Sequence, residues 1–188
     1  MRTHVALLRG INVGGHNKVA MSDLRDVATS LGLADVVTYI QSGNVAFRTD
    51  ETDSARLAQA LAGAIAERLD VRPSVVVLSR DQLARVIEDN PFQEETDHRR
   101  LHAIFGRQLT DQDGLSTVAE ARRRTGDPGS RDQARVVGST VYLHTPDGFA
   151  GSKLAAELTR PRGRLTRDAV GTARNWATVM RLMGLLGD

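Results

Sequence analysis

The order of strand-like and helix-like segments in the first half of the chain limits its fold more than any other feature. Short apolar runs suited to β-strands lie at 4–8, 36–40, 44–48 and 73–78. Apolar residues at helical spacing indicate helices at 21–31, where Ser22 is the expected N-cap, and at 52–69. The order β-α-β-β-α-β is typical of the ferredoxin-like, split βαβ arrangement. The sequence therefore predicts an α+β fold with a ferredoxin-like domain over residues 1–92.

The second half of the chain shows a weaker form of the same order. A short helix is expected at 80–88 and a linker in the polar stretch 93–100. Beyond it, the pattern predicts strands at 101–105, 134–137 and 140–144, and helices at 115–123, 152–158 and 173–186. We therefore expect a second, related α+β domain over residues 93–188 that ends in a C-terminal helix. An internal duplication would account for the likeness of the two halves.

Composition narrows the classes of protein that this chain can belong to. The absence of cysteine excludes disulfides, thiol catalysis and thiolate metal sites. No run of about 18 apolar residues is present, so no membrane span is expected. The chain enters a strand pattern at once, without the pattern of a signal peptide, which favours a cytoplasmic location. Arginine outnumbers lysine 23 to 2, which suggests a GC-rich and therefore bacterial genome.

Positive charge is concentrated near the C-terminus, although the net charge of the chain is only +2. The segment 160–181 carries one acidic residue, Asp168, against Arg160, Arg162, Arg164, Arg167, Arg174 and Arg181. A solvated basic face is one interpretation. Attraction of an anionic ligand or of a nucleic acid is the other.

Two polar turns are expected to meet at one edge of the first sheet. A helix connects the first two strands, so these strands run parallel. The turn after the first strand, residues 10–20, then lies at the same edge as the hairpin turn at 41–44. We call this predicted edge, residues 9–18 with 41–44, the rim.

The residues of the rim are suited to binding a small anion. Gly14 and Gly15 let the backbone approach a ligand and turn its amides towards it. Arg9 and Lys18 supply positive charge, and the remaining candidates supply polar groups: Asn12, Asn17, Gln41, Ser42 and Asn44. The alternative is that the glycines and asparagines only form turns, with Asn12 or Asn44 bonded to its own loop.

A third candidate segment precedes the final helix. Thr172 is the expected N-cap of that helix, which would place Arg174 in its first turn. A bound anion would offset the unfavourable position of a cation there, so Arg174 and Asn175 are candidates for closing the site. Alternatively, Arg174 pairs with an acidic side chain. Trp176 fits either the core or a stacking surface.

Familiar catalytic and cofactor motifs do not fit this sequence. The spacing Gly10-x4-Gly15 is followed by His16 rather than lysine, which excludes a phosphate-binding P-loop, and the dinucleotide-binding glycine pattern is absent. The spacing of His98 and His102 is a poor match to a zinc site, so no metal is expected. His16 and Ser42 lack an evident third group for nucleophilic catalysis. No catalytic residue or cofactor is identified.

Three segments resemble domain-of-unknown-function family 1697. They are the run Ala6–Val19 with Met21, Leu24 and Arg25, the run Thr38–Val45 with Phe47, and the ending Thr172–Val179. The resemblance implies a small bacterial, cytosolic α+β protein containing ferredoxin-like structure, and it implies no activity. Ala20 departs from the proline that is common before the first helix of the family.

Three functional hypotheses remain open from the sequence. The first is a protein that binds a small phosphorylated or carboxylated ligand at the rim. The second is a transferase or hydrolase acting on an anionic substrate at the same rim. The third is a nucleic-acid-binding module that uses the arginines of 160–181. The sequence leaves the ligand, any reaction and the oligomeric state undetermined.

Overall fold

The computed structural model describes residues 1–106, 110–160 and 172–187. The chain forms two compact units. The first contains Met1–Arg85 together with Arg181–Asp188, and the second contains Val86–Met180. That residues 1–92 and 93–188 fold as separate domains stays a prediction.

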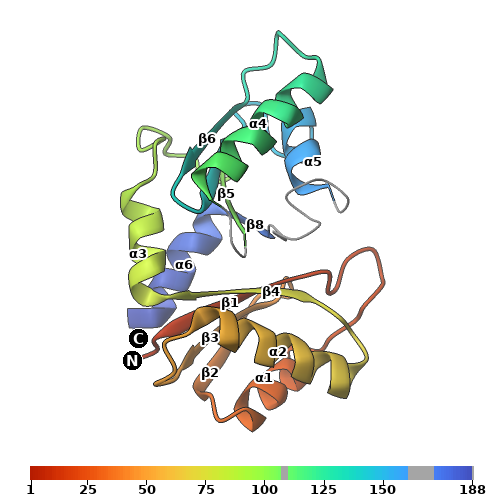
Figure 1. The fold of residues 1–188 in the computed structure, drawn as a ribbon, viewed down its shortest axis with the longest axis vertical. Coiled ribbons are helices and arrows are strands. Elements are labelled where there is room, and N and C mark those ends of the chain that lie inside the picture. Colours follow the sequence, from red (N-terminus) through yellow and green to blue (C-terminus); the bar gives the residue numbers. More distant parts are fainter. Residues whose placement is uncertain (107–109, 161–171, 188) are drawn as a thin grey trace. The chain divides into compact units, whose positions relative to one another are not determined.

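The first unit has the predicted βαββαβ order. Its elements are β1 (His4–Arg9), α1 (Met21–Ser30), β2 (Ala34–Tyr39), β3 (Asn44–Arg48), α2 (Ser54–Leu69) and β4 (Ser74–Ser79). The strands form one sheet in the order β2-β3-β1-β4. Helices α1 and α2 lie together on one face of this sheet (Figure 1). The ferredoxin-like arrangement is confirmed for this unit.

The register of the sheet explains why strand β1 is buried along its length. It pairs antiparallel with β3, where Ala6 faces Val45, and with β4, where Ala6 faces Val77. Because β2 also pairs antiparallel with β3, β1 and β2 run parallel, as predicted. Side chains alternate between the faces, so Ala6 and Leu8 share the core with residues of α1 and α2.

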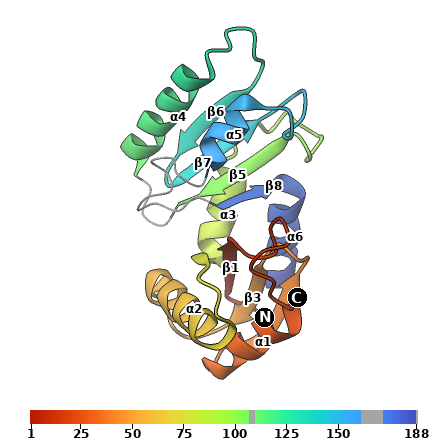
Figure 2. The ribbon, with the colours of Figure 1, turned by 90° about the vertical axis from the view of Figure 1, so that its right-hand side faces the viewer.

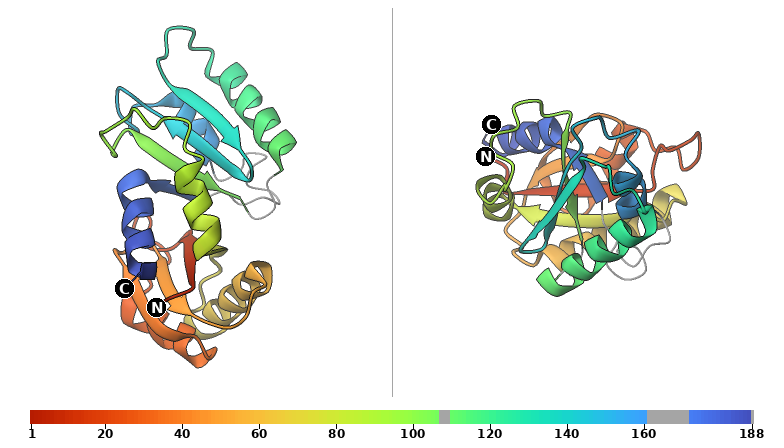
Figure 3. Two further views of the ribbon diagram at one scale, coloured as in Figure 1. Left: turned by 90° about the vertical axis from the view of Figure 1, so that its left-hand side faces the viewer. Right: turned by 90° about the horizontal axis from the view of Figure 1, so that it is seen from above.

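The second unit repeats the topology of the first. Its sheet elements and covering helices are β5 (Leu101–Phe105), α4 (Asp111–Thr125), β6 (Gln133–Val137), β7 (Thr140–His144), α5 (Lys153–Thr159) and β8 (Thr172–Asn175). The strand order β6-β7-β5-β8 matches β2-β3-β1-β4 position by position. Figures 2 and 3 show α4 and the β6–β7 hairpin of this unit from two sides. The second half is therefore a related α+β unit, as predicted.

Two helices contain residues of both units. They are α3 (Arg80–Glu88), which has the predicted bounds, and α6 (Trp176–Gly187). The start of α6 belongs to the second unit, and its end from Arg181 onward belongs to the first.

The predicted start of the final helix is wrong. Residues 172–175 form strand β8, which pairs with β5 and places Thr172 opposite Phe105. Helix α6 begins at Trp176, and Asn175 Oδ1 accepts a hydrogen bond from the amide of Ala177 at 3.0 Å. Thr172 is therefore not an N-cap. Tertiary pairing with β5 outweighs the local capping signal.

Two other helix starts also differ from the sequence prediction. Ala20, not Ser22, is the N-cap of α1, and it makes no side-chain capping bond. Helix α4 begins at Asp111, before the predicted start at Leu115, because Thr110 and Asp113 form a reciprocal capping box. The apolar pattern begins only at Leu115, so it does not mark this polar first turn.

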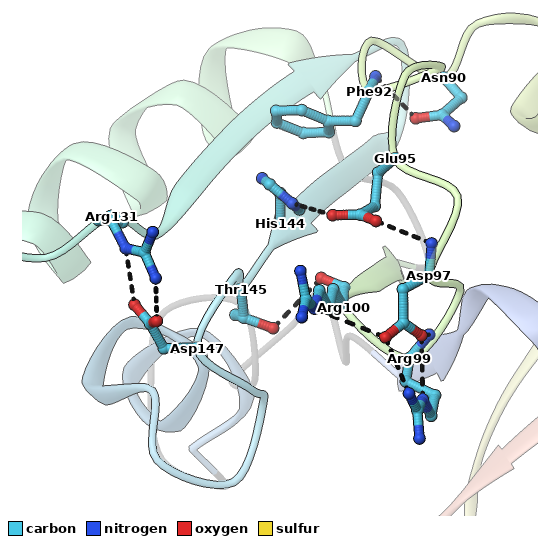
Figure 4. Close-up of polar contacts among 10 residues, drawn as sticks. All are labelled: Asn90, Phe92, Glu95, Asp97, Arg99, Arg100, Arg131, His144, Thr145 and Asp147. Carbon is cyan, nitrogen blue, oxygen red and sulfur yellow. Dashed lines mark hydrogen bonds and ion pairs between the residues drawn. The ribbon is translucent and has the colours of Figure 1, made fainter.

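The expected linker is bound to the second unit. Glu95 Oε2 lies 2.7 Å from His144 Nε2 in β7, and the Phe92 ring packs against His144 (Figure 4). Thr145 Oγ1 donates to the carbonyl of Arg100 at 3.2 Å. The polar composition of 93–100 thus reflects ion pairs and turns on the surface of this unit, and not a free connection.

Candidate functional site

The two polar turns of the first unit contact each other. The amide of Leu8 at the end of β1 donates to the carbonyl of Gly43 at 2.7 Å. The Asn12 side chain donates to the carbonyl of Gln41 at 3.0 Å. The turn after β1 and the β2–β3 turn therefore share one edge of the sheet, as the strand order predicted.

The loop after β1 contains a small hairpin of its own. The amide of Asn12 donates to the carbonyl of Asn17 at 3.0 Å, and the amide of His16 donates to that of Val13 at 3.0 Å. Between them, Gly14 and Gly15 have φ values of 58° and 81°. Two consecutive positive φ angles are typical of the tight turns that close two-residue hairpins. The loop extends away from the sheet, as the red segment after β1 shows in Figure 1.

The asparagines of the rim bond to their own loops. Asn12 donates to the Val19 carbonyl at 3.0 Å and accepts from its amide at 2.8 Å, in addition to its bond to Gln41. Asn17 donates to the Gly10 carbonyl at 2.8 Å. Asn44 is fully buried and donates to the Tyr39 carbonyl and to Ser42 Oγ. These side-chain bonds therefore agree with the alternative interpretation, in which the asparagines stabilise their own turns.

The charged residues of the rim differ in their burial. Lys18 is exposed and has no ion pair within the part of the chain that the structure describes. Arg9 is half-buried at the end of β1, and desolvation lowers the pKa of its guanidinium. The side chains of Gln41 and Ser42 are exposed on the adjoining turn. Lys18, Gln41 and Ser42 are thus the exposed members of this set, and Arg9 is half-buried.

Arg174 and Asn175 belong to the second unit, whereas the rim belongs to the first. Arg174 is 8% exposed, bonds to Thr172 Oγ1 at 2.6 Å, and has its pKa lowered to about 10 by burial. Trp176 is buried and its ring lies 6.2 Å from that of Tyr142, which favours its core interpretation. A role of Arg174 and Asn175 at the rim stays a prediction.

The arginine-rich segment gives little support to nucleic-acid binding. Arg162, Arg164 and Arg167 lie outside the described residues. Arg160 pairs with Glu157 at 2.5 Å, Arg174 is buried, and Arg181 is exposed. This hypothesis, like that of an enzyme acting at the rim, stays a prediction.

Some contacts were not foreseen from the sequence. The pair formed by Glu95 and His144 joins residues 49 positions apart, and each side chain is about 15% exposed (15% and 16%). No spacing rule connects residues at that separation. Among the described residues, no group of three or more His, Cys, Asp or Glu side chains is arranged to hold a metal ion. Within the same residues, every helix is too short or too polar to cross a bilayer.

Comparisons with known proteins match the chain to one family model and to a solved structure. The family model described as "Protein of unknown function (DUF1697)" matches residues 1–142. The chain is similar to the solved structure of the conserved bacterial protein SP0830 from Streptococcus pneumoniae. That similarity has a TM-score of 0.74 at 26% sequence identity and covers 98% of each chain. No curated protein matches the chain.

Proposed function

The chain belongs to the DUF1697 family of proteins of unknown function, and we propose that it binds a small ligand bearing phosphate or carboxylate at the rim. The observation that carries this proposal is the bridge from Asn12 to Gln41, which joins the two polar turns through a 3.0 Å hydrogen bond. Binding sites gain affinity when their loops are held in place before the ligand arrives.

Lys18 and Arg9 supply the charge recognition in this proposal. Both side chains are cationic and belong to the segment 9–18 of the rim, and cations of this kind bind phosphate or carboxylate. Ser42 and Gln41 add neutral polar groups that orient the ligand.

The asparagines and glycines have a supporting role in the same proposal. Asn12, Asn17 and Asn44 hold the backbone of the two turns, while Gly14 and Gly15 close the hairpin between Asn12 and Asn17. The positive φ angles of Asn12, Asn17, Gly14 and Gly15 suit asparagine and glycine better than other residues. These five residues therefore shape the rim, and the charged residues contact the ligand.

Thermal unfolding of the full chain with inorganic phosphate or citrate tests the proposal. A ligand that binds the folded state raises Tm with its concentration. We expect Lys18→Gln to lose most of that rise, since Lys18 is exposed and the substitution leaves the fold intact. Arg56→Gln is the matched control, because Arg56 is an exposed cation of the same unit in the first turn of α2, which follows the end of β3 opposite the rim. An equal loss of the rise in both variants would refute a specific site, as would the absence of any rise.

A further inference from the structure

The second unit has longer connections than the first at one end of its sheet. Helix α1 reaches β2 through residues 31–33, whereas α4 reaches β6 through 126–132. Likewise, β3 leads to α2 through 49–53, whereas β7 leads to α5 through 145–152. Because both units have the same topology, the fold does not require the added length. Long loops on a shared scaffold are common places for binding residues.

The two longer loops are fixed to each other by side-chain bonds. Arg131 and Asp147 form a two-pronged ion pair, one arm of which is 3.0 Å long (Figure 4). Ser152 Oγ donates to Asp132 Oδ2 at 2.6 Å and accepts from the amide of Ala155 at 2.8 Å. Ser152 is buried. The two loops at this end of the unit are therefore held together by an ion pair and by hydrogen bonds.

A cavity of about 470 Å³ lies against these loops. Its lining includes Arg122 and Arg123 from the end of α4, Asp127 and Asp132 from the first loop, and Lys153 and Leu154 from the start of α5. Cavities of this size hold small molecules. All of its lining residues belong to the second unit, so the cavity is independent of the rim.

Charges of both signs line the cavity. Lys153 Nζ lies 3.2 Å from Asp127 Oδ2, and Arg123 pairs with Glu120. Arg122 is exposed and has no ion pair within the described residues. Its guanidinium fork is suited to a carboxylate. The last turn of α4 is also the negative end of the helix dipole, which favours a cationic group. Arg123 and Lys153 each already face a carboxylate, so Arg122 supplies the charge that a ligand carboxylate would balance.

We propose that this cavity binds a free acidic amino acid. Arg122 binds one carboxylate of the ligand through its fork, and Lys153 binds the second. Asp127 accepts hydrogen bonds from the ligand's ammonium group, replacing part of its present pairing with Lys153. A simple dicarboxylate offers no partner to Asp127, and a neutral amino acid leaves one cation of the cavity unmatched.

Isothermal titration of the full chain with L-glutamate tests this inference. We expect millimolar or tighter binding, and binding of glutarate about tenfold weaker because glutarate lacks the ammonium group. Arg122→Gln should weaken glutamate binding by about tenfold or more, and Arg122→Lys should weaken it as well, because lysine keeps the charge but not the fork. Asp127→Asn should abolish the preference for glutamate over glutarate.

Arg68→Gln is the matched control for these titrations. Arg68 is an exposed arginine in the last turn of α2, as Arg122 is in the last turn of α4, and it lies in the other unit. This variant should bind glutamate as the wild type does. Equal weakening by Arg68→Gln and Arg122→Gln would overturn the inference. So would equal affinity for glutamate and glutarate in the wild type, or the absence of binding at millimolar glutamate.

Discussion

Positive φ angles in the first unit fall largely on asparagine and glycine. Asn12 and Asn17 have φ values of 53° and 51°, and the side chain of each bonds to a backbone group of the same loop. The sequence predicted polar residues suited to a ligand at these positions. An asparagine that bonds to its own turn and one that binds a ligand look alike in sequence, because both occur in polar loops rich in glycine.

Gly43, in the β2–β3 turn, is more closely surrounded by side chains than Gly14, in the loop after β1. A Cβ atom at Gly43 would lie 2.7 Å from Leu8 Cβ and 2.8 Å from Ile11 Cδ1, and φ there is 76°. At Gly14, with φ of 58°, a Cβ atom would meet nothing within 4 Å. We expect Gly14→Ala to lower the free energy of unfolding by about 1 kcal/mol, from backbone strain alone. Gly43→Ala should lower it by about 2–4 kcal/mol, since it adds overpacking.

Urea denaturation of the two glycine variants measures this difference. The prediction is wrong if Gly43→Ala is no less stable than Gly14→Ala.

His102 couples the stability of the second unit to pH. It is 8% exposed, its ring stacks on Phe149 at a centroid distance of 3.9 Å, and burial lowers its pKa to about 4. The folded state therefore binds a proton less readily than the unfolded state. The contribution of neutral His102 to stability is complete above about pH 6.5 and is lost as pH falls towards about 4.

His102→Phe removes this titration and keeps an aromatic ring against Phe149. We expect the free energy of unfolding of the variant to fall less between about pH 7 and about pH 4, by up to about 3 kcal/mol. Burial also lowers the pKa of His4, so part of the acid sensitivity should remain. Urea denaturation at a series of pH values measures the change. Parallel pH profiles for the two proteins would contradict the prediction.

Some helices and strands have the bounds that the sequence predicted, and others do not. Helix α3 and strands β3, β5 and β7 have the bounds expected from their periodicity. The start of α4 was misplaced because its first turn is polar. Strand β8 was missed because its four residues are recognisable only through their pairing with β5.

The caps of two helices in the first unit offer a direct comparison. Asp53 accepts hydrogen bonds from the amides of Ala55 and Arg56 at 2.9 and 3.0 Å, which caps α2. Ser22 lies inside α1, and its hydroxyl donates to the adjacent Asp23 side chain at 3.2 Å. We expect Asp53→Ala to cost about 1 kcal/mol of stability and Ser22→Ala to change it by less than about 0.5 kcal/mol. Chemical denaturation of both variants checks this, and a Ser22 effect as large as that of Asp53 would refute it.

The same topology occurs in both units, and the C-terminal helix α6 contributes residues to each of them. The end of α6 belongs to the first unit, where Leu182 and Leu186 are buried and Arg2 Nη1 donates to the Leu185 carbonyl at 2.9 Å. The predicted domain boundary at residue 92 would separate the end of α6 from the first unit, to which it belongs.

A fragment of residues 1–92 should therefore be destabilised. We expect fusion of residues 176–188 to its C-terminus through a flexible Gly/Ser linker to raise the free energy of unfolding by at least about 1.5 kcal/mol, the value of one buried leucine. The control is the same fusion with Leu186→Ser, which should give a smaller increase. Circular dichroism during urea denaturation measures the three proteins. Equal stability of the fragment and the fusion would contradict the prediction.

Local periodicity was sufficient to predict the α+β class, the βαββαβ order and the meeting of the two turns. Each of these follows from the spacing of apolar residues and from the parity of a helical crossover. The pairing of β8, the partners of Asn12 and the contact between Glu95 and His144 could not be predicted in that way. They depend on which backbone and side-chain groups the packed units bring within hydrogen-bonding distance. The sequence marks neither the choice of partners within the two turns nor the pairing of residues 49 positions apart.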